Sequence, residues 1–110
     1  MPSRSWQNRI QDILAAIAEI DRFTAGMTFE QFQADPKTVR AVLYDLAIIG
    51  EAVRSIPPEI EIQHPDIPWE EARGMRNIVM HEYFRVNLAI VWQTVQTDLP
   101  QLALSLGQLL

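Results

Sequence analysis

Apolar residues recur three or four positions apart along nearly the whole of this 110-residue chain. Such spacing places successive apolar side chains on one face of an α-helix. No segment alternates between apolar and polar residues with the period of two that marks a β-strand, so the sequence predicts an all-α protein. The first of these apolar seams consists of Trp6, Ile10, Ile13, Ile17 and Ile20.

Capping signals flank the first predicted helix and the short turn after it. Ser3 or Ser5 can cap the start of the first helix, and Gly26 lies just beyond its end. Thr28 with Gln31 resembles a capping box, in which each side chain bonds the backbone amide of the other residue. The sequence therefore predicts a helical turn that starts near residue 29.

The later helices carry similar signals. Asp35 followed by Pro36 is a strong helix start, and Pro68 should open another helix after a proline-rich surface connection. Asn87 can cap the last helix, where Pro100 should cause a kink because proline removes a backbone donor and crowds the preceding turn. The two apolar seams are Val39, Val42, Leu46, Ile49 and Val53, and Leu88, Trp92, Val95, Leu99, Leu102, Leu106 and Leu109.

Four main helices predict an antiparallel bundle of four to five helices, which forms one domain over residues 1–110. The seams are wide and the last helix is rich in leucine to its end. Some apolar surface should therefore stay outside the bundle, and a homodimer is the simplest closed arrangement that covers it.

Composition excludes several classes of protein. The chain has no cysteine, so disulfides, thiol catalysis and cysteine-based zinc sites are absent. Its two histidines, His64 and His81, lie far apart with no adjacent carboxylate pattern, so the sequence indicates neither a metal nor a cofactor. A net charge of -5 argues against a protein that coats nucleic acid. No apolar run reaches the roughly 18 residues of a membrane span, and we expect a soluble, cytoplasmic protein without membrane contact.

The groups with chemical potential concentrate in the segment RGMRNIVMHEY, from Arg73 to Tyr83. On a helix, Arg76, Asn77, His81 and Tyr83 fall on one side. Asn77 and His81 are four positions apart and face each other, so the amide can orient the imidazole. The opposite side of the same helix carries the apolar residues Ala72, Met75, Ile78 and Val79.

Arginine and histidine suffice in principle to cleave RNA without a metal ion. The guanidinium group binds phosphate and stabilises the charge that develops during phosphoryl transfer. The imidazole titrates near neutral pH and can remove or return a proton while the ribose 2′-hydroxyl attacks. One such pair is sparse, and a second copy across a two-fold axis would supply the missing acid or base. On spacing alone, a solvated helix face is the more common explanation of this cluster.

Three other residues are further candidates. Arg73 and Arg85 add positive charge beside Arg76 and could contact RNA. Glu51 is either a buried acid near the arginines of this segment or a carboxylate on the surface of its own helix.

The chain resembles the HepT-like group of the HEPN superfamily, the toxin halves of toxin–antitoxin pairs in bacteria and archaea. Three segments carry the resemblance in the family's order and spacing: IIGEAVRSIP (Ile48 to Pro57), HPDIPWEEARGMRNIVMHEYF (His64 to Phe84) and VNLAIVWQTVQTDLPQL (Val86 to Leu102). Where family members commonly have a Gly-Val-Asp turn, this chain has Arg-Val-Asn from Arg85 onward.

The resemblance implies a dimeric helical bundle that acts as a metal-independent endoribonuclease, the toxin of a type VII toxin–antitoxin system. Arg76 and His81 match the catalytic pair, which faces its symmetry copy across the dimer cleft, and Asn77 matches the polar residue beside that arginine. Tyr83 matches the tyrosine to which the cognate minimal nucleotidyltransferase antitoxin (MntA-like) transfers AMP. The RNA substrate, a transfer RNA or a messenger RNA, stays open. The alternative is a non-catalytic helical adaptor that binds nucleotide or docks a nucleotidyltransferase.

Overall fold

Every secondary-structure element in the described part of the chain is a helix, which confirms the all-α prediction. This computed structural model describes the backbone of residues 5–82 and 87–110 and the side chains of residues 5–77 and 87–110. The elements are α1 (Trp6–Thr24), α2 (Phe29–Gln33), α3 (Pro36–Arg54), α4 (Pro58–Gln63), α5 (Trp69–Glu82), α6 (Leu88–Gln93), the π-helical segment η2 (Thr94–Asp98) and α7 (Leu99–Gly107).

Side-chain caps fix the starts of the first three helices. The Ser5 hydroxyl accepts a hydrogen bond of 3.3 Å from the backbone amide three residues later. Thr28 and Gln31 form the predicted capping box, with bonds of 2.9 and 3.1 Å. Asp35 accepts bonds from the hydroxyl and the amide of Thr38 at 2.7 and 3.3 Å, and these bonds lower the pKa of Asp35. The capping signals of the sequence therefore form as predicted.

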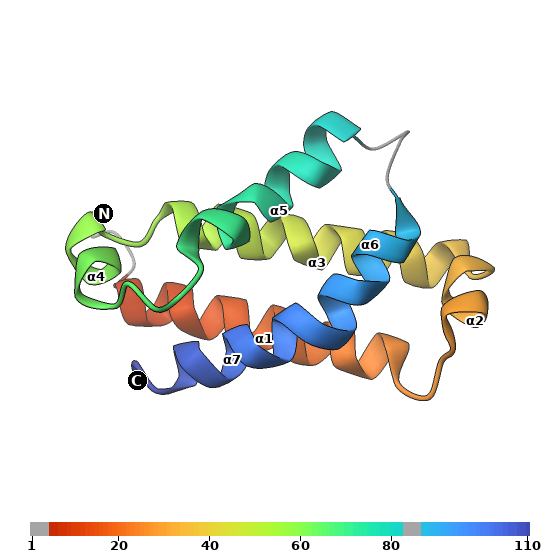
Figure 1. Cartoon of the computed structure of the whole chain (residues 1–110), viewed down its shortest axis with the longest axis horizontal. Helices are drawn as coiled ribbons and strands as arrows, with labels where there is room; N and C mark the ends of the chain where they lie inside the picture. The colour runs from red at the N-terminus through yellow and green to blue at the C-terminus, as the bar shows by residue number, and fades with distance from the viewer. Residues whose placement is uncertain (1–4, 83–86) are drawn as a thin grey trace.

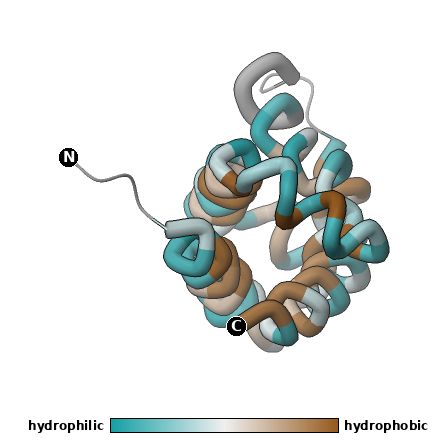
Figure 2. Tube along the Cα trace, turned by 90° about the vertical axis from the view of Figure 1, so that its left-hand side faces the viewer, coloured by the Kyte–Doolittle hydropathy of each residue, from teal (hydrophilic) through white to brown (hydrophobic). Residues whose placement is uncertain are grey.

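Helix α3 lies at the centre of the bundle, between α1 on one side and α5 on the other. Figure 1 shows α1 and α3 running antiparallel, with α7 returning along α1. Seen along the bundle in Figure 2, the helices surround a common interior and turn apolar positions toward it. The seam residues Ile10, Ile13, Ile20, Leu46 and Ile49 are at most 1% exposed. The predicted seams therefore form one shared core.

The kink expected at Pro100 takes the form of a π-helical segment. Residues Thr94–Asp98 form η2, directly before α7, and Pro100 lies in the first turn of α7. Proline has no N–H to donate and crowds the turn before it. A wider turn accommodates that loss without ending the helical run, so α6, η2 and α7 follow one another as the fourth long helical stretch.

The tryptophans serve as packing residues, as predicted. Trp69 is 5% exposed, and its Nε1 donates a hydrogen bond of 2.9 Å to the carbonyl oxygen of His64. This bond ties the start of α5 to the connection before it. Trp92 packs against Phe32 and Phe29 of α2, with ring centroids 5.1 and 6.4 Å apart. Trp6 is partly buried against the core.

Candidate active site

Helices α3 and α5 approach each other closely at Gly50. A Cβ atom added to Gly50 would lie 2.6 Å from the backbone nitrogen of Arg76 and 2.7 Å from its Cβ. It would also lie 3.1 Å from the carbonyl oxygen of Arg73. Only glycine allows this contact between two helix backbones. Gly50 therefore places the α3 surface directly beside the base of the Arg76 side chain.

Replacing Gly50 by alanine should destabilise the fold. Overpacking against a helix backbone costs about 1–3 kcal/mol, which outweighs the gain of up to about 1 kcal/mol from the better helix former. We expect a net loss of about 1–2 kcal/mol in the free energy of unfolding, measured by urea titration.

Gly74 provides the matched control, because it lies in α5 and a Cβ added there meets nothing within 4 Å. Gly74→Ala should raise the free energy of unfolding by about 0.5–1 kcal/mol. Equal stabilisation by both substitutions would show that α3 and α5 do not touch at Gly50.

The close approach brings Glu51 to Arg76. The Nε atom of Arg76 lies 2.9 Å from Oε2 of Glu51, and the same carboxylate oxygen lies 3.7 Å from a guanidinium nitrogen of Arg54. The Arg76 side chain is 32% exposed and that of Glu51 is 61% exposed. Glu51 thus lies beside an arginine of the segment from Arg73 to Tyr83, as one of the two alternatives predicted. It is nevertheless a surface carboxylate, as the other alternative predicted, and not a buried acid.

Arg73 is held by a second, separate carboxylate. One of its terminal nitrogens lies 2.7 Å from Oε1 of Glu61, which comes from α4. This ion pair attaches the short helix α4 to α5 and joins residues 12 positions apart in the sequence. The two arginines therefore engage different elements, and Arg73 is 36% exposed beside its partner.

The other predicted site residues are only partly within the described chain. Asn77 is exposed on α5. His81 belongs to α5 by its backbone, but its side chain lies outside the described residues. Tyr83 and Arg85 also lie outside them. That the Arg76 and His81 side chains lie on the same side of α5 therefore stays a prediction. On the apolar side of α5, Ala72 and Met75 are buried as predicted.

Helix α3 contains a buried carboxyl group that the sequence pattern did not predict. Asp45 is 2% exposed, and its Oδ2 atom has no hydrogen-bond partner within the described chain. Burial, together with a hydrogen bond and the charge of Glu19, raises the pKa of Asp45 to about 7, against the opposing charge of Arg22. The signal for this group was its position, three residues after Val42 in the apolar seam.

Two further structural findings bear on function. Among the side chains that the structure describes, no three histidine, aspartate or glutamate groups are placed to hold a metal ion. No helix within the described ranges combines the length and the apolar character needed to cross a membrane.

A bundle of helices in which Glu51 of α3 holds Arg76 of α5 in an ion pair defines this chain as a small all-α protein. The family model described as Ribonuclease HepT-like matches residues 13–109, and the chain belongs to this family. It is 43% identical over 99 residues to "Probable ribonuclease HepT" of Thermococcus cleftensis, which covers 90% of each chain. A "Putative RNase" of Caldanaerobacter subterraneus subsp. tengcongensis is 42% identical over 85 residues, or 77% of this chain and 76% of the relative.

A third relative extends the comparison. A protein of Methanocaldococcus jannaschii, also named "Putative RNase", is 36% identical over 100 residues, which is 91% of this chain and 83% of the relative. No solved structure gives a significant match to this chain.

Proposed function

We propose that this protein is a metal-independent endoribonuclease and the toxin of a type VII toxin–antitoxin pair. The observation that carries the proposal is the position of the Arg76 side chain, which is both anchored and exposed. Glu51 holds this arginine through Nε at 2.9 Å, while the side chain keeps 32% of its surface exposed. A guanidinium group anchored through Nε can still offer its two terminal nitrogens to the oxygens of a phosphate. Family membership makes RNA the source of that phosphate.

The proposed reaction uses the RNA's own nucleophile. His81, five positions after Arg76 on α5, takes the proton of the ribose 2′-hydroxyl, whose oxygen attacks the adjacent phosphorus. The bond from phosphorus to the 5′-oxygen breaks, and that oxygen receives a proton from a second, protonated histidine. Arg76 stabilises the additional negative charge on the phosphoryl oxygens. The products are a 2′,3′-cyclic phosphate and a 5′-hydroxyl end.

A homodimer supplies the second histidine. One copy of the chain offers a single motif imidazole, whereas the reaction needs a base and an acid at the same time. In a two-fold dimer the same surface meets its own copy, so two motif helices facing each other place two arginines and two histidines around one RNA strand. Asn77 orients the imidazole in this proposal, and Arg73 and Arg85 contact flanking phosphates.

The test is RNA cleavage by the purified protein in EDTA, with analysis of the product ends. Cleavage to cyclic phosphate and 5′-hydroxyl ends supports the proposal. The acidic charge balance of the chain favours the alternative, a helical adaptor that binds nucleotide or docks a nucleotidyltransferase. A nucleotide-dependent complex formed by a protein that cuts no RNA would support that alternative.

Transfer of AMP to Tyr83 by the cognate minimal nucleotidyltransferase is the proposed means of neutralisation. An AMP group adds negative charge and bulk seven positions from Arg76, where the RNA phosphates would bind. Co-expression with the antitoxin should add the mass of one or more AMP groups to the intact protein and abolish its cleavage of RNA.

Tyr83→Phe provides the control for this modification. The variant should gain no mass on co-expression, and its cleavage of RNA should persist in the presence of the antitoxin. A mass increase retained in Tyr83→Phe would place the modification on another residue.

A further inference from the structure

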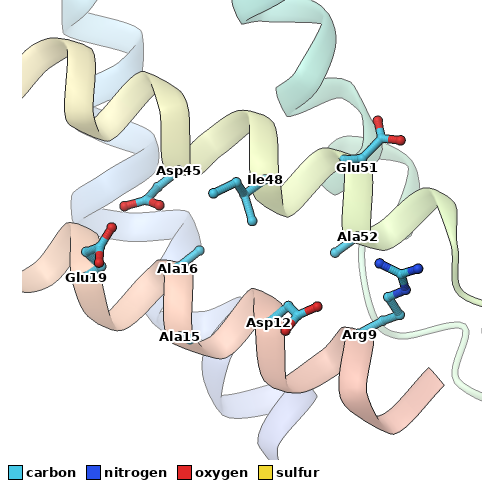
Figure 3. Close-up of a pocket in the computed structure, with 9 residues that line it drawn as sticks. All are labelled: Arg9, Asp12, Ala15, Ala16, Glu19, Asp45, Ile48, Glu51 and Ala52. Carbon is cyan, nitrogen blue, oxygen red and sulfur yellow. The ribbon is translucent and has the colours of Figure 1, made fainter. Parts of the chain in front are cut away.

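A groove lies between α1 and α3, on the side of α3 that faces away from α5 (Figure 3). Its volume is about 400 Å³. Most of its polar lining is acidic, and its apolar lining consists mainly of alanines. The lining residues are Arg9, Asp12, Ala15, Ala16, Glu19, Asp45, Ile48, Glu51 and Ala52.

Asp45 is the unusual group of this groove. It is almost fully buried, yet Oδ2 has no hydrogen-bond partner in the described part of the chain. Figure 3 shows the carboxyl groups of Asp45 and Glu19 turned toward each other between the two helices. A buried polar atom without a partner costs roughly 1–3 kcal/mol. Among the described residues, therefore, none donates a hydrogen bond to Oδ2 of Asp45 at this end of the groove.

The rest of the groove suits a slim aliphatic stem. Ala16 and Ala52 present small side chains between the helices, beside Ile48, and Ala15 is a third alanine of the lining. Long cationic side chains pack their methylene groups along such apolar surface and keep the charged end on polar groups. The groove thus offers apolar contact along its length and two carboxyl groups at one end.

We propose that this groove binds the arginine side chain of a protein partner, with the guanidinium group on Asp45 and Glu19. A planar guanidinium fork donates two parallel bonds, which suits two neighbouring carboxyl groups better than a single ammonium does. The stem lies along the alanines. Arg22 does not already fill the place, since it meets Glu19 only at 3.8 Å and its side chain is 69% exposed.

Binding of the arginine should release a proton. Burial beside Glu19 raises the pKa of Asp45 to about 7, so below that pH the empty groove holds the Asp45 carboxyl group protonated. A guanidinium group favours the ionised carboxylate, so binding below pH 7 releases this proton, whereas at pH 8 Asp45 is already ionised. The other charged groups around the groove are Arg9, Asp12 and Arg22 of α1, and Glu51 of α3, which is paired with Arg76 of α5.

An NMR titration of the full chain tests this proposal. The probe is the tripeptide Ala-Arg-Ala, acetylated and amidated, added at pH 8. We expect the Asp45 side-chain carboxyl signal and the amides of α1 and α3 to shift to saturation, with a Kd on the order of 1 mM. The same peptide with citrulline, which has the shape of arginine without the charge, should cause no saturable shift.

Two variants make the test specific. Asp45→Asn should weaken binding of the arginine peptide at least tenfold, while Asp21→Asn, on the exposed face of α1, should leave it unchanged. Equal binding of the citrulline peptide, or unchanged binding by Asp45→Asn, would overturn the proposal. Self-association of the chain that Asp45→Asn abolishes would assign the groove to a second copy instead. The readout is peptide binding, so the result does not depend on RNA cleavage.

Discussion

Replacing Arg76 by alanine is expected to lower the rate of RNA cleavage by about 10²–10³-fold, the usual effect of removing one group that stabilises transition-state charge. His81→Ala should cost a similar amount, about 10²–10⁴-fold, because the proton transfers lose their base and acid. Arg76→Lys should rescue little, since an ammonium cannot bond a phosphate bidentately while it contacts Glu51. The measurement is the initial rate of cleavage in EDTA.

Arg22→Ala is the control for these substitutions, because Arg22 is an exposed arginine of α1 that pairs only weakly with Glu19. Its cleavage rate should equal that of the wild type. All variants should unfold at a similar urea concentration, since surface ion pairs contribute about 1 kcal/mol or less. Cleavage that survives both Arg76→Ala and His81→Ala would discard the catalytic assignment.

Replacing Asp45 by asparagine is expected to stabilise the protein at pH 8, by roughly 3–4 kcal/mol as an upper limit. The physical reason is burial. Ionisation of Asp45 beside Glu19 is unfavourable in the folded state, and its pKa rises from 3.8 to about 7. Asparagine is neutral at every pH and can still donate a hydrogen bond to Glu19, as the protonated acid does.

The sign of this effect follows from proton binding. Between pH 3.8 and about 7, folded Asp45 holds a proton that the unfolded chain has lost. The free energy of unfolding of the wild type therefore falls across that range as the pH rises. Urea titrations at pH 4 and pH 8 should show almost no gain from Asp45→Asn at pH 4 and the full gain at pH 8.

Asp21→Asn serves as the control on the same protein. Asp21 is exposed on α1 and its replacement should change the stability little at either pH. A gain from Asp45→Asn that is equal at pH 4 and pH 8 would mean that the carboxyl group is not held protonated by burial.

Local chemistry made much of the fold predictable from sequence. The capping box of Thr28 and Gln31 and the cap at Asp35 depend on residues three positions apart, so the sequence alone contains the whole interaction. The effect of Pro100 was predictable in kind, as a disturbed helix. The form of this disturbance was not predictable, because the helix continues through a π-helical turn, Thr94–Asp98, instead of breaking at the proline.

Interactions between helices were harder to predict, and the sequence offered the nearness of Glu51 to the arginines only as one of two alternatives. The pair of Glu51 and Arg76 depends on the contact of α3 with α5 at Gly50, and no local spacing encodes that contact. The partnership of Arg73 with Glu61 has the same origin. The position of Asp45 beside an apolar seam could have indicated its burial. Its neighbour Glu19 comes from another helix, so the sequence pattern could not predict their contact. The roles of His81 and Tyr83 rest on family resemblance and stay predictions.

The most direct test of the central claim uses mixed dimers. Wild-type chains and chains carrying both Arg76→Ala and His81→Ala, each with its own affinity tag, are co-expressed, and the dimers that carry both tags are isolated. If two copies build one site, cleavage of RNA in EDTA by these mixed dimers should fall at least tenfold below that of the wild-type dimer. A mixed dimer that keeps half of the wild-type rate, or a wild-type dimer that cuts no RNA, would contradict the account.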